Sequence, residues 1–378
     1  MKIGVYLLGA NGNIATTLTT GTFQYKKKNR RPIGLLTELD EVKVIGHKFP
    51  TPKNVFFAGC DINKLDHIEA AYNNNTVAHP LIKTVANNLA KIDILHLSKN
   101  DLLSSAIVYR KIVFHINKFK RTKKLDCVIV VNLTSTTGDK IAAKKFQREK
   151  KLQRAIKNNE PIPFGIIYAY AAIIAGAPYI NFTPNVSCEI PAIIEAANTY
   201  GIPICGKDGK TGQTLYKLIL ASLFKWRNLL VHSWYSTNML GNNDGKALQK
   251  KENLRLKYDT KASGLFNILK YTIDQQIHIH YIMHKGDAKE AWDSIEFSGW
   301  LDIPMSMKIN WLGHDSALAA PLVFDLVRLM HLFYTKKIKG LVPELGCFFK
   351  APHKSTTADF SAQINQLLDK LRSLKSKI

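Results

Sequence analysis

Short, almost wholly apolar runs alternate with longer stretches of helical character in the first half of the chain. The runs at residues 3–9, 55–62 and 127–134 are strand-like, and a helix is predicted after the first of them, through residues 14–18. Strands buried on both faces of a parallel sheet read as continuous apolar runs, because helices cover the two faces. This half of the chain therefore predicts a parallel α/β sheet.

The pattern changes in the second half. A helix at residues 164–176 and a strand at 178–184 still continue the first pattern, but residues 232–240 and 277–284 alternate like antiparallel strands, with helices before and between them. Residues 316–337 return to a helix apolar enough to pack on a sheet. The order predicts one domain built from both ends of the chain, with an α+β domain inserted into it.

Composition narrows the class of protein. The 378 residues are 46% hydrophobic, a size and content typical of two globular domains, and the net charge is +24. Such a charge suggests nucleic acid, anionic membrane or small anionic substrates. The lysines are spread over the whole length with no Arg-rich arm, zinc-finger spacing or RNA-binding signature, so we expect no nucleic-acid partner. A catalytically weak basic binding protein is kept as an alternative.

Cysteine usage and the apolar segments bear on the compartment. The five cysteines are scattered without a CxxC pair, which favours reduced thiols in a cytoplasm. The first residues resemble a strand and not a signal peptide. The uncharged run 164–184 approaches membrane length but contains Gly176 and two prolines, so we interpret it as a buried helix, a turn and a strand. We expect a soluble, cytoplasmic protein with no membrane partner.

Glycines at the first strand-to-helix turn indicate a nucleotide site. In "LLGANGNIATTL", residues 7–18, Gly9, Gly12 and Ala15 form a Gly-x-x-Gly-x-x-Ala pattern. Glycine lets the backbone approach a pyrophosphate, while the helix N-terminus offers free N–H groups and the positive end of a dipole. A plain tight turn is the alternative. The dinucleotide interpretation assigns cofactor contacts to Gly9, Ala10, Asn11, Gly12, Asn13 and Ile14.

Two later segments extend this interpretation. Asp61 ends the second strand, where a carboxylate can accept hydrogen bonds from the adenine ribose, although a loop-like insert at residues 25–32 stretches the usual spacing. Residues 132–138, "NLTSTTG", end the third strand with small hydroxyl residues, as expected where nicotinamide and substrate meet. An ordinary polar loop is the alternative there. We expect an NAD cofactor contacted by Asp61, Asn132, Thr134 and Ser135.

Four further stretches, 206–214, 256–261, 285–293 and 348–352, combine lysines with turn residues or carboxylates. In the first, the backbone and hydroxyl groups of Thr211, Gly212, Gln213 and Thr214 can cradle a phosphate at the start of a helix through residues 215–223. Lys257 and Lys261 stand at i and i+4, where like charges on a helix repel by a few tenths of a kcal/mol unless an anion lies between them. Solvent exposure is the alternative for any single lysine.

Taken together, these motifs resemble the myo-inositol-1-phosphate synthase (inositol-3-phosphate synthase) family, in its compact prokaryotic form. The matching stretches span residues 3–352 in order: "GANGNIATTL", "GCDIN", "YAYAAIIAGAPYINFTP", "KDGKTGQT", "LGNNDG", "LKYDTK", "GDAKEAWD", "HDSALAAPLVFDL" and "FFKAP". The resemblance implies a Rossmann-type NAD-binding domain of residues 1–185 and 316–378. It also implies an inserted α+β catalytic and oligomerisation domain of residues 186–315, and a homotetramer.

The resemblance also implies the chemistry. Glucose 6-phosphate would be oxidised at C5 with NAD, lose a C6 proton to give an enolate, cyclise by aldol attack on C1, and be reduced again at C5, giving myo-inositol 1-phosphate. Charge and protons at O5 and O1 would fall to Lys257 and Lys350, with Asp208 and Asp315 tuning the lysines. The phosphate ligands would be Thr211, Gly212, Gln213, Thr214, Lys261 and Lys289, with Lys289 also counted as catalytic. The pocket wall would comprise Asn242, Asn243 and Asp244.

Some features depart from the family or stay open. The family usually has Ser-Lys-Glu-x-Ser-Lys where this chain has "LKYDTK", and many members carry an acidic residue where His314 stands here. An NAD-dependent enzyme of the same fold that acts on another sugar phosphate is therefore an alternative. His278 and His280 share a strand face and are interpreted as structural. The family can use ammonium or a divalent cation, and no residue pattern here assigns a metal ligand.

Overall fold

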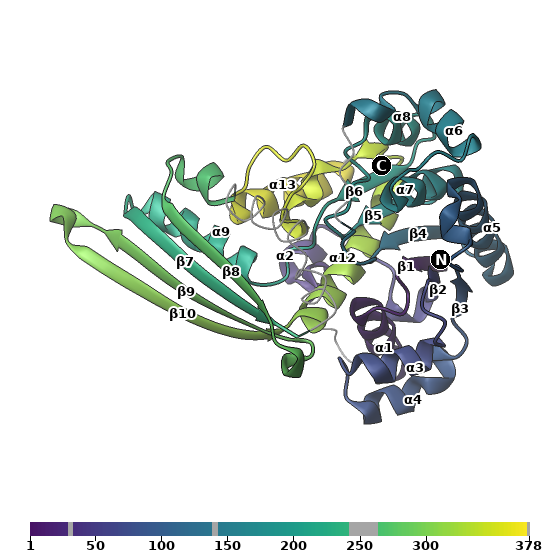
Figure 1. The fold of residues 1–378 in the computed structure, drawn as a ribbon, viewed down its shortest axis with the longest axis horizontal. Coiled ribbons are helices and arrows are strands. Elements are labelled where there is room, and N and C mark those ends of the chain that lie inside the picture. Colours follow the sequence, from purple (N-terminus) through teal and green to yellow (C-terminus); the bar gives the residue numbers. More distant parts are fainter. Residues whose placement is uncertain (29–32, 138–142, 242–263, 376–378) are drawn as a thin grey trace.

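The computed structural model describes residues 1–28, 33–137, 143–241 and 264–375 (Figure 1). Its larger sheet has seven strands, and every neighbouring pair in it is parallel. The strand order is β11-β6-β5-β4-β1-β2-β3, so the winding direction reverses at β1. Ligands of such open sheets bind beyond the carboxyl ends of the strands at this reversal. The strands are β1 (Ile3–Leu8), β2 (Val55–Asp61), β3 (Asp93–His96), β4 (Cys127–Asn132), β5 (Tyr179–Asn181), β6 (Pro203–Gly206) and β11 (Gly340–Leu341).

Helices cover both faces of this sheet, which is why its strands are apolar on both sides (Figure 1). One face packs against α1 (Asn13–Lys28), α2 (Asp40–Lys43), α3 (His67–Asn74), α4 (His79–Leu89), α12 (Asp315–Thr335) and α13 (Phe360–Lys375). The other packs against α5 (Ser105–Lys123), α6 (Glu149–Lys157), α7 (Phe164–Ile174) and α8 (Pro191–Thr199). The 3-10 helices are η1 (Leu36–Glu38), η2 (Pro52–Asn54), η3 (Asp101–Leu103), η4 (Ala143–Phe146), η5 (Met283–Lys285), η6 (Trp300–Asp302) and η7 (Pro343–Phe348).

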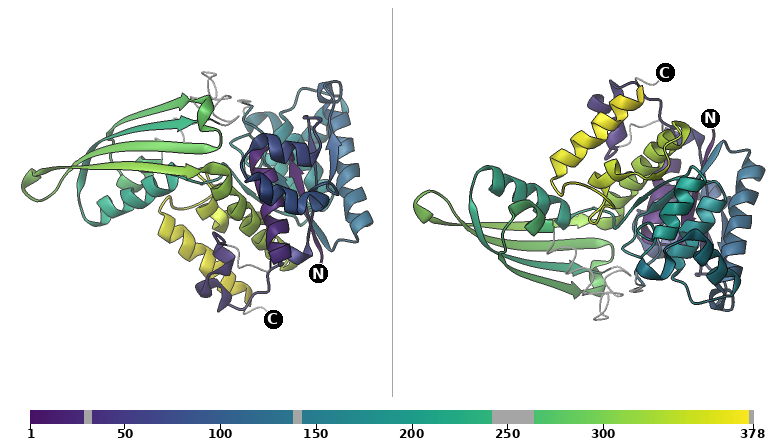
Figure 2. Two further views of the ribbon diagram at one scale, coloured as in Figure 1. Left: turned by 90° about the horizontal axis from the view of Figure 1, so that it is seen from below. Right: turned by 90° about the horizontal axis from the view of Figure 1, so that it is seen from above.

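The second sheet has four strands in the order β10-β9-β7-β8. Helix α9 (Gln213–Trp226) covers one of its faces, and Figure 2 shows the sheet projecting away from the seven-stranded domain. Its inner face carries Trp234 against Phe224 and Ile295, all in one buried cluster. The strands are β7 (Leu230–Leu240), β8 (Asp274–Tyr281), β9 (Ala288–Ser298) and β10 (Pro304–His314).

The pairing of β7 with β8 corrects the sequence-based expectation. The alternation at residues 232–240 and 277–284 suggested antiparallel strands, but β7 and β8 run parallel, while β9 is antiparallel to both β7 and β10. Alternation reports only that one face is buried, and it is the same in both directions. Parallel neighbours need a long crossover, and the chain between β7 and β8, which includes a helical stretch at 264–269, supplies one.

Other predicted elements compare as follows. The strands expected at 3–9, 55–62 and 127–134 are confirmed, but the four-residue strand β3 between the last two was missed. The loop-like insert was wrong for residues 25–28, because α1 continues to Lys28. The domain boundary expected at residue 186 stays a prediction, although α8 and β6, which lie beyond it, pack with the seven-stranded sheet.

Helix α12 joins the two sheets. It follows β10 directly, and its first turn is held by Asp287, whose carboxylate accepts from Ser316 N at 3.1 Å and Ser316 Oγ at 2.6 Å. Burial raises the pKa of Asp287, and the bonds from Ser316 oppose that rise. Within the described part of the chain, α12 is the one helix long and apolar enough to cross a membrane. However, 78% of that stretch is buried inside the protein, as expected for a core helix.

Candidate active site

The glycine turn after β1 has the geometry of a dinucleotide cradle. Gly9 has φ of 80°, and the amides of Gly9 and Ala10 both donate to Cys60 O, at 3.0 and 3.1 Å. A Cβ on Gly9 would stand 3.0 Å from Leu133 O, and one on Gly59 would stand 2.3 Å from Leu7 O. The turn is therefore pressed onto both neighbouring strands, which leaves the start of α1 facing the crevice, and the residues present fit an NAD pyrophosphate.

Asp61 lies beside this turn, as the sequence predicted. Its Oδ2 accepts from Asn11 N at 2.8 Å, and its Oδ1 from Asn63 N at 2.8 Å. The side chain of Asn11 points the other way, donating to Leu65 O at 2.8 Å and contacting the ring of His67 at 3.2 Å. Asn11 thus shapes the turn from behind, and the amides of Asn11 and Asn63 hold the carboxylate of Asp61 beside the turn. Its contact with a ribose stays a prediction.

His67 was missed by sequence reasoning, because a histidine six residues after the end of a strand carries no recognisable signal. It is buried against α1, where its Nε2 lies 2.8 Å from Thr19 Oγ1. Burial lowers the pKa of His67 to about 4, with a smaller opposing effect from Asp66. The ring is therefore neutral at physiological pH and acts as a fixed hydrogen-bonding link between α1 and the cofactor turn.

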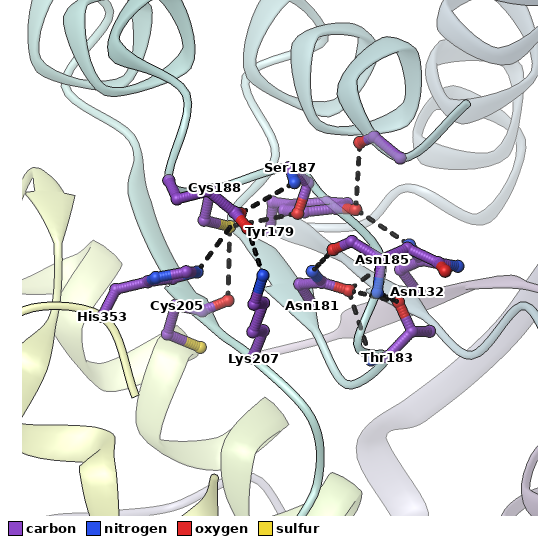
Figure 3. Close-up of polar contacts among 12 residues, drawn as sticks. Asn132, Tyr179, Asn181, Thr183, Asn185, Ser187, Cys188, Cys205, Lys207 and His353 are labelled. Atoms are coloured by element: carbon purple, nitrogen blue, oxygen red, sulfur yellow. Dashed lines mark hydrogen bonds and ion pairs between the residues drawn. The ribbon is translucent and has the colours of Figure 1, made fainter. Parts of the chain in front are cut away.

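Three buried asparagines support the loop after β4 (Figure 3). Asn132 Oδ1 accepts from the N and Oγ1 of Thr134, at 3.1 and 2.8 Å, and its amide nitrogen donates to Tyr179 OH at 3.1 Å. Asn185 donates to Ser135 O at 2.9 Å, and Asn181 donates to Asn185 O at 2.7 Å. Asn132, which was expected to contact the cofactor, is thus fully buried beneath this loop. Asn181 and Asn185 are supporting residues that the sequence analysis did not single out.

Asp208 and Lys350 meet although 142 residues separate them. Lys350 Nζ donates to Asp208 Oδ1 at 2.8 Å, and Lys350 N donates to Asp208 O at 2.7 Å. The pair lies within two antiparallel segments, 206–210 and 348–353, joined by further backbone hydrogen bonds and by a bridge between Gly209 and Phe349. Backbone pairing therefore fixes the register of the two side chains. The sequence analysis left open which carboxylate accompanies which lysine, and in the structure Lys350 pairs with Asp208.

A second carboxylate, Glu189, holds both segments from the side. It forms an ion pair with Lys207, lies 3.5 Å from the ring of His353 and accepts from Ser187 N at 2.9 Å. Figure 3 shows Lys207 and His353 converging from the two segments. Burial would raise the pKa of Glu189, but Lys207 and His353 hold this pKa below its usual value. Glu189 was missed, because its chain neighbourhood gives no hint of either partner.

On the opposite wall, Thr211, Asp315 and Lys289 gather at the junction of the two sheets. Thr211 Oγ1 donates to Asp315 Oδ1 at 2.6 Å, and Lys289 Nζ lies 3.7 Å from the same oxygen. Gly212 immediately precedes α9, and a Cβ there would stand 2.8 Å from the ring of Trp311. The helix expected through residues 215–223 is confirmed, so the amides of residues 211–214 lie at a helix start, as a phosphate cradle requires.

Gln213 has a role other than the expected ligand contact. Its side chain is buried, donating to Asp293 Oδ2 at 2.9 Å and accepting from Asn238 Nδ2 at 2.6 Å, so its backbone is the part left for a phosphate. Asp293 also pairs with Lys217 at 3.5 Å. The carboxylate accepts hydrogen bonds from four side chains of α9 and the second sheet: Gln213, Tyr216, Trp234 and Ser236.

Two cavities adjoin these groups. The smaller one spans the cofactor crevice and the catalytic candidates, with Ile14, Thr134, Asp208, Thr211, Lys289, Asp315 and Lys350 in its walls. The larger one, of about 760 Å³, shares Lys350 and Thr214 with that neighbourhood and is lined by four more lysines. The structure thus brings together most of the predicted site. Five predicted residues fall outside the described part of the chain: Lys257, Lys261, Asn242, Asn243 and Asp244.

No metal site accompanies these groups where the chain is described: no cluster of three or more His, Cys, Asp or Glu side chains there is placed to hold an ion. His278 and His280 do share a face of β8, as predicted, and their rings stack 6.3 Å apart. All five cysteines are free and buried.

The fold and the site define a dinucleotide-binding α/β enzyme whose catalytic wall is rich in lysine. Comparison with known proteins gives the family. The family model for NAD-binding proteins described as Myo-inositol-1-phosphate synthase matches residues 3–374, and the chain belongs to this family. The chain is 32% identical to an inositol-3-phosphate synthase 1 of Bacteroides thetaiotaomicron over 93% of its length and 89% of the relative. It is 27% identical to the inositol-3-phosphate synthase of Trypanosoma brucei brucei, over 88% and 73% of the two chains.

Solved structures agree in fold. The crystal structure of inositol-3-phosphate synthase from Caenorhabditis elegans superposes with a TM-score of 0.88 at 22% identity, covering 99% of this chain and 86% of that one. A synthase-related protein from Thermotoga maritima gives a TM-score of 0.78 at 21% identity, over 98% of both chains. The predicted family and α/β class are therefore confirmed.

Proposed function

We propose that the protein is an NAD-dependent inositol-3-phosphate synthase, which isomerises glucose 6-phosphate to myo-inositol 1-phosphate (1D-myo-inositol 3-phosphate) for inositol and phospholipid precursor synthesis. One observation carries the proposal most strongly. The pair Asp208–Lys350 and the cluster Thr211–Asp315–Lys289 line the same cavity as Ile14 and Thr134 of the cofactor crevice. A sugar phosphate bound there would lie between the expected nicotinamide position and a set of cations, as the chemistry requires.

Each group has a chemical task in this scheme. Bound NAD supplies hydride acceptance and return at C5. Lys350, held by Asp208, is placed to carry a proton at O5 and to stabilise negative charge on that oxygen. Lys289 beside Asp315, with the start of α9, would hold the phosphate. Asn132, Asn181 and Asn185 hold the loop at Thr134 through buried hydrogen bonds, which would fix this wall of the crevice.

The uncovered face of the second sheet supports an oligomer, which we propose to be a homotetramer. Tyr235 and Trp292 point out of this face with 43% and 48% of their surface exposed, and the ring of Tyr235 packs on His278. Figure 2 shows α9 on the other face only. A broad sheet face that carries exposed aromatic side chains is typical of a subunit contact. Sedimentation velocity at several concentrations tests the state.

The activity is tested by phosphorus NMR of the protein with glucose 6-phosphate and catalytic NAD. Lys350→Ala should remove the inositol monophosphate signal while leaving NAD affinity within about two-fold, because the cation acts on the substrate and not on the cofactor turn. The matched control is Lys118→Ala on α5, which breaks an exposed pair with Asp93, lines neither cavity and should turn over normally. Unchanged glucose 6-phosphate, with NAD binding confirmed, would point instead to another sugar phosphate.

The same reaction tests the remaining expectations. An ammonium ion or a divalent cation is proposed as an activator, and titrating each into the cation-stripped enzyme should raise the initial rate with one of them. The five free thiols support a cytoplasmic protein. Fractionation of the source cells, followed by detection of the protein, checks that location.

A further inference from the structure

The larger cavity has an unusual electrostatic lining. Its lining residues come from α9, the helical stretch at 264–269, the segment 349–358 and α13, among others. Its volume of about 760 Å³ is in the range of small-molecule sites. As far as the structure describes its walls, they hold no carboxylate but five lysines: Lys210, Lys217, Lys225, Lys270 and Lys350. Such a wall raises the local concentration of anions.

Lys210 is the cation in this wall that most needs a partner. Its surface is only 3% exposed, and its Nζ donates to the neutral oxygen Oε1 of Gln363 at 2.9 Å and lies 5.6 Å from the ring of Phe360. Among the described residues it pairs with no carboxylate, whereas the equally buried Lys217 pairs with Asp293. A buried ammonium without a counter-charge costs several kcal/mol, and burial accordingly lowers the pKa of Lys210 to about 8.

We propose that this cavity binds a phosphoryl anion, with Lys210 as its buried anchor. The anion would supply the missing counter-charge, and the hydroxyl groups of Thr214, Thr356 and Thr357 line the same space as hydrogen-bond donors. Lys225 and Lys270 are exposed and would draw the anion in from solvent. Two sources share this chemistry: the phosphate of the sugar substrate, in which case the site rests on the proposed function, or a free phosphate compound bound beside it.

Calorimetric titration of the NAD-loaded protein with inorganic phosphate at pH 7 tests the anchor. Lys210→Met, which keeps the volume of the side chain without its charge, should weaken binding at least ten-fold. The matched control Lys118→Met removes an exposed lysine from α5 and should bind phosphate within two-fold of the wild type. Equal affinity of Lys210→Met and wild type overturns the proposal, as does a wild type that does not bind phosphate.

A second variant separates loss of the site from loss of the fold. Gln363→Glu places a carboxylate against Lys210 and should abolish phosphate binding as Lys210→Met does. Its unfolding transition should stay cooperative, because the new ion pair offsets the loss of the hydrogen bond from Gln363 Nε2 to Thr357 O at 2.8 Å. In the wild type, phosphate affinity should also fall between pH 7 and pH 9 as Lys210 loses its proton, and this fall should be absent in Lys210→Met. A phosphate affinity unchanged by Gln363→Glu contradicts the anchor.

The source of the anion is decided by repeating the titration with saturating glucose 6-phosphate. Competition assigns the cavity to the phosphate of the substrate, and additive binding assigns it to a separate phosphate compound. Failure of the proposed function is seen independently, as absent turnover in the NMR reaction with phosphate binding intact.

Discussion

The most informative single perturbation is Asp293→Asn in β9. Each carboxylate oxygen of Asp293 accepts two hydrogen bonds, and Lys217 lies 3.5 Å away. The side chain of Asp293 is 0% exposed and that of Lys217 is 3% exposed. Although burial alone would raise it, Lys217 and the donors hold the pKa of Asp293 below its usual value. An asparagine is the same size but presents an NH2 group, which must face two of the four donors in either orientation.

The expected cost follows from these contacts. Each buried hydrogen bond lost in this way costs about 1–3 kcal/mol. Removing one partner of a buried ion pair costs about 3–5 kcal/mol, because Lys217 is left without a counter-charge. Part of each term is relieved by relaxation, so we expect the free energy of unfolding of the second sheet to fall by about 4 kcal/mol. Because Gln213 loses its anchor at the start of α9, substrate affinity should fall as well.

Tryptophan fluorescence during guanidinium unfolding is the appropriate assay. All five tryptophans lie between residues 226 and 311, so the signal reports on the second sheet and α9. The control is Asp302→Asn in η6, between β9 and β10, where the same change is made at an exposed carboxylate and should cost below about 1 kcal/mol. If Asp293→Asn unfolds within 1 kcal/mol of Asp302→Asn, the reasoning about this buried network is refuted.

Three further outcomes are expected. Gly59→Ala should lower the free energy of unfolding by about 1–3 kcal/mol and weaken NAD binding, because the new Cβ would stand 2.3 Å from Leu7 O. The control Gly21→Ala, whose Cβ would have no atom within 4 Å, should be neutral or stabilising. Equal NAD affinities of the two variants by calorimetry would contradict this. His67 is neutral in the fold, so its contribution to stability is present above its unfolded pKa near 6.5 and is lost as the pH falls toward 4. Over that range the free energy of unfolding of the wild type should fall by up to about 3 kcal/mol more than that of His67→Gln. Parallel stability curves of the two proteins would exclude this contribution. Glu189→Gln should reduce kcat at least ten-fold with NAD affinity unchanged. Adding Lys207→Gln should restore part of the rate, because no unpaired charge remains. A double variant no faster than the single one counts against the role of Glu189 in holding the two segments.

Features formed by residues close together in the sequence could be predicted, whereas features formed by residues far apart in the sequence could not. The glycine turn, the helix starting at Gln213 and the strand ending at Asp61 are local features, encoded by residues a few positions apart, and all three are confirmed. Family resemblance named Asp208 and Lys350 but not their pairing, and no local pattern connects residues 142 positions apart. Glu189 and Asn181 were missed for the same reason, since their partners come from other segments.

The sequence by itself determined the alternation of buried strands and helices, the cofactor turn and the lysine-rich motifs, because hydrophobic periodicity and backbone preference are local. The tertiary structure decided the direction of β8 beside β7, which alternation leaves open because both directions bury the same face. It also decided which lysines are neutralised: Lys217 by Asp293 and Lys350 by Asp208, while Lys210 is buried against a neutral amide. Charge pairing depends on distance in space and on burial, and both exist only once the chain has folded.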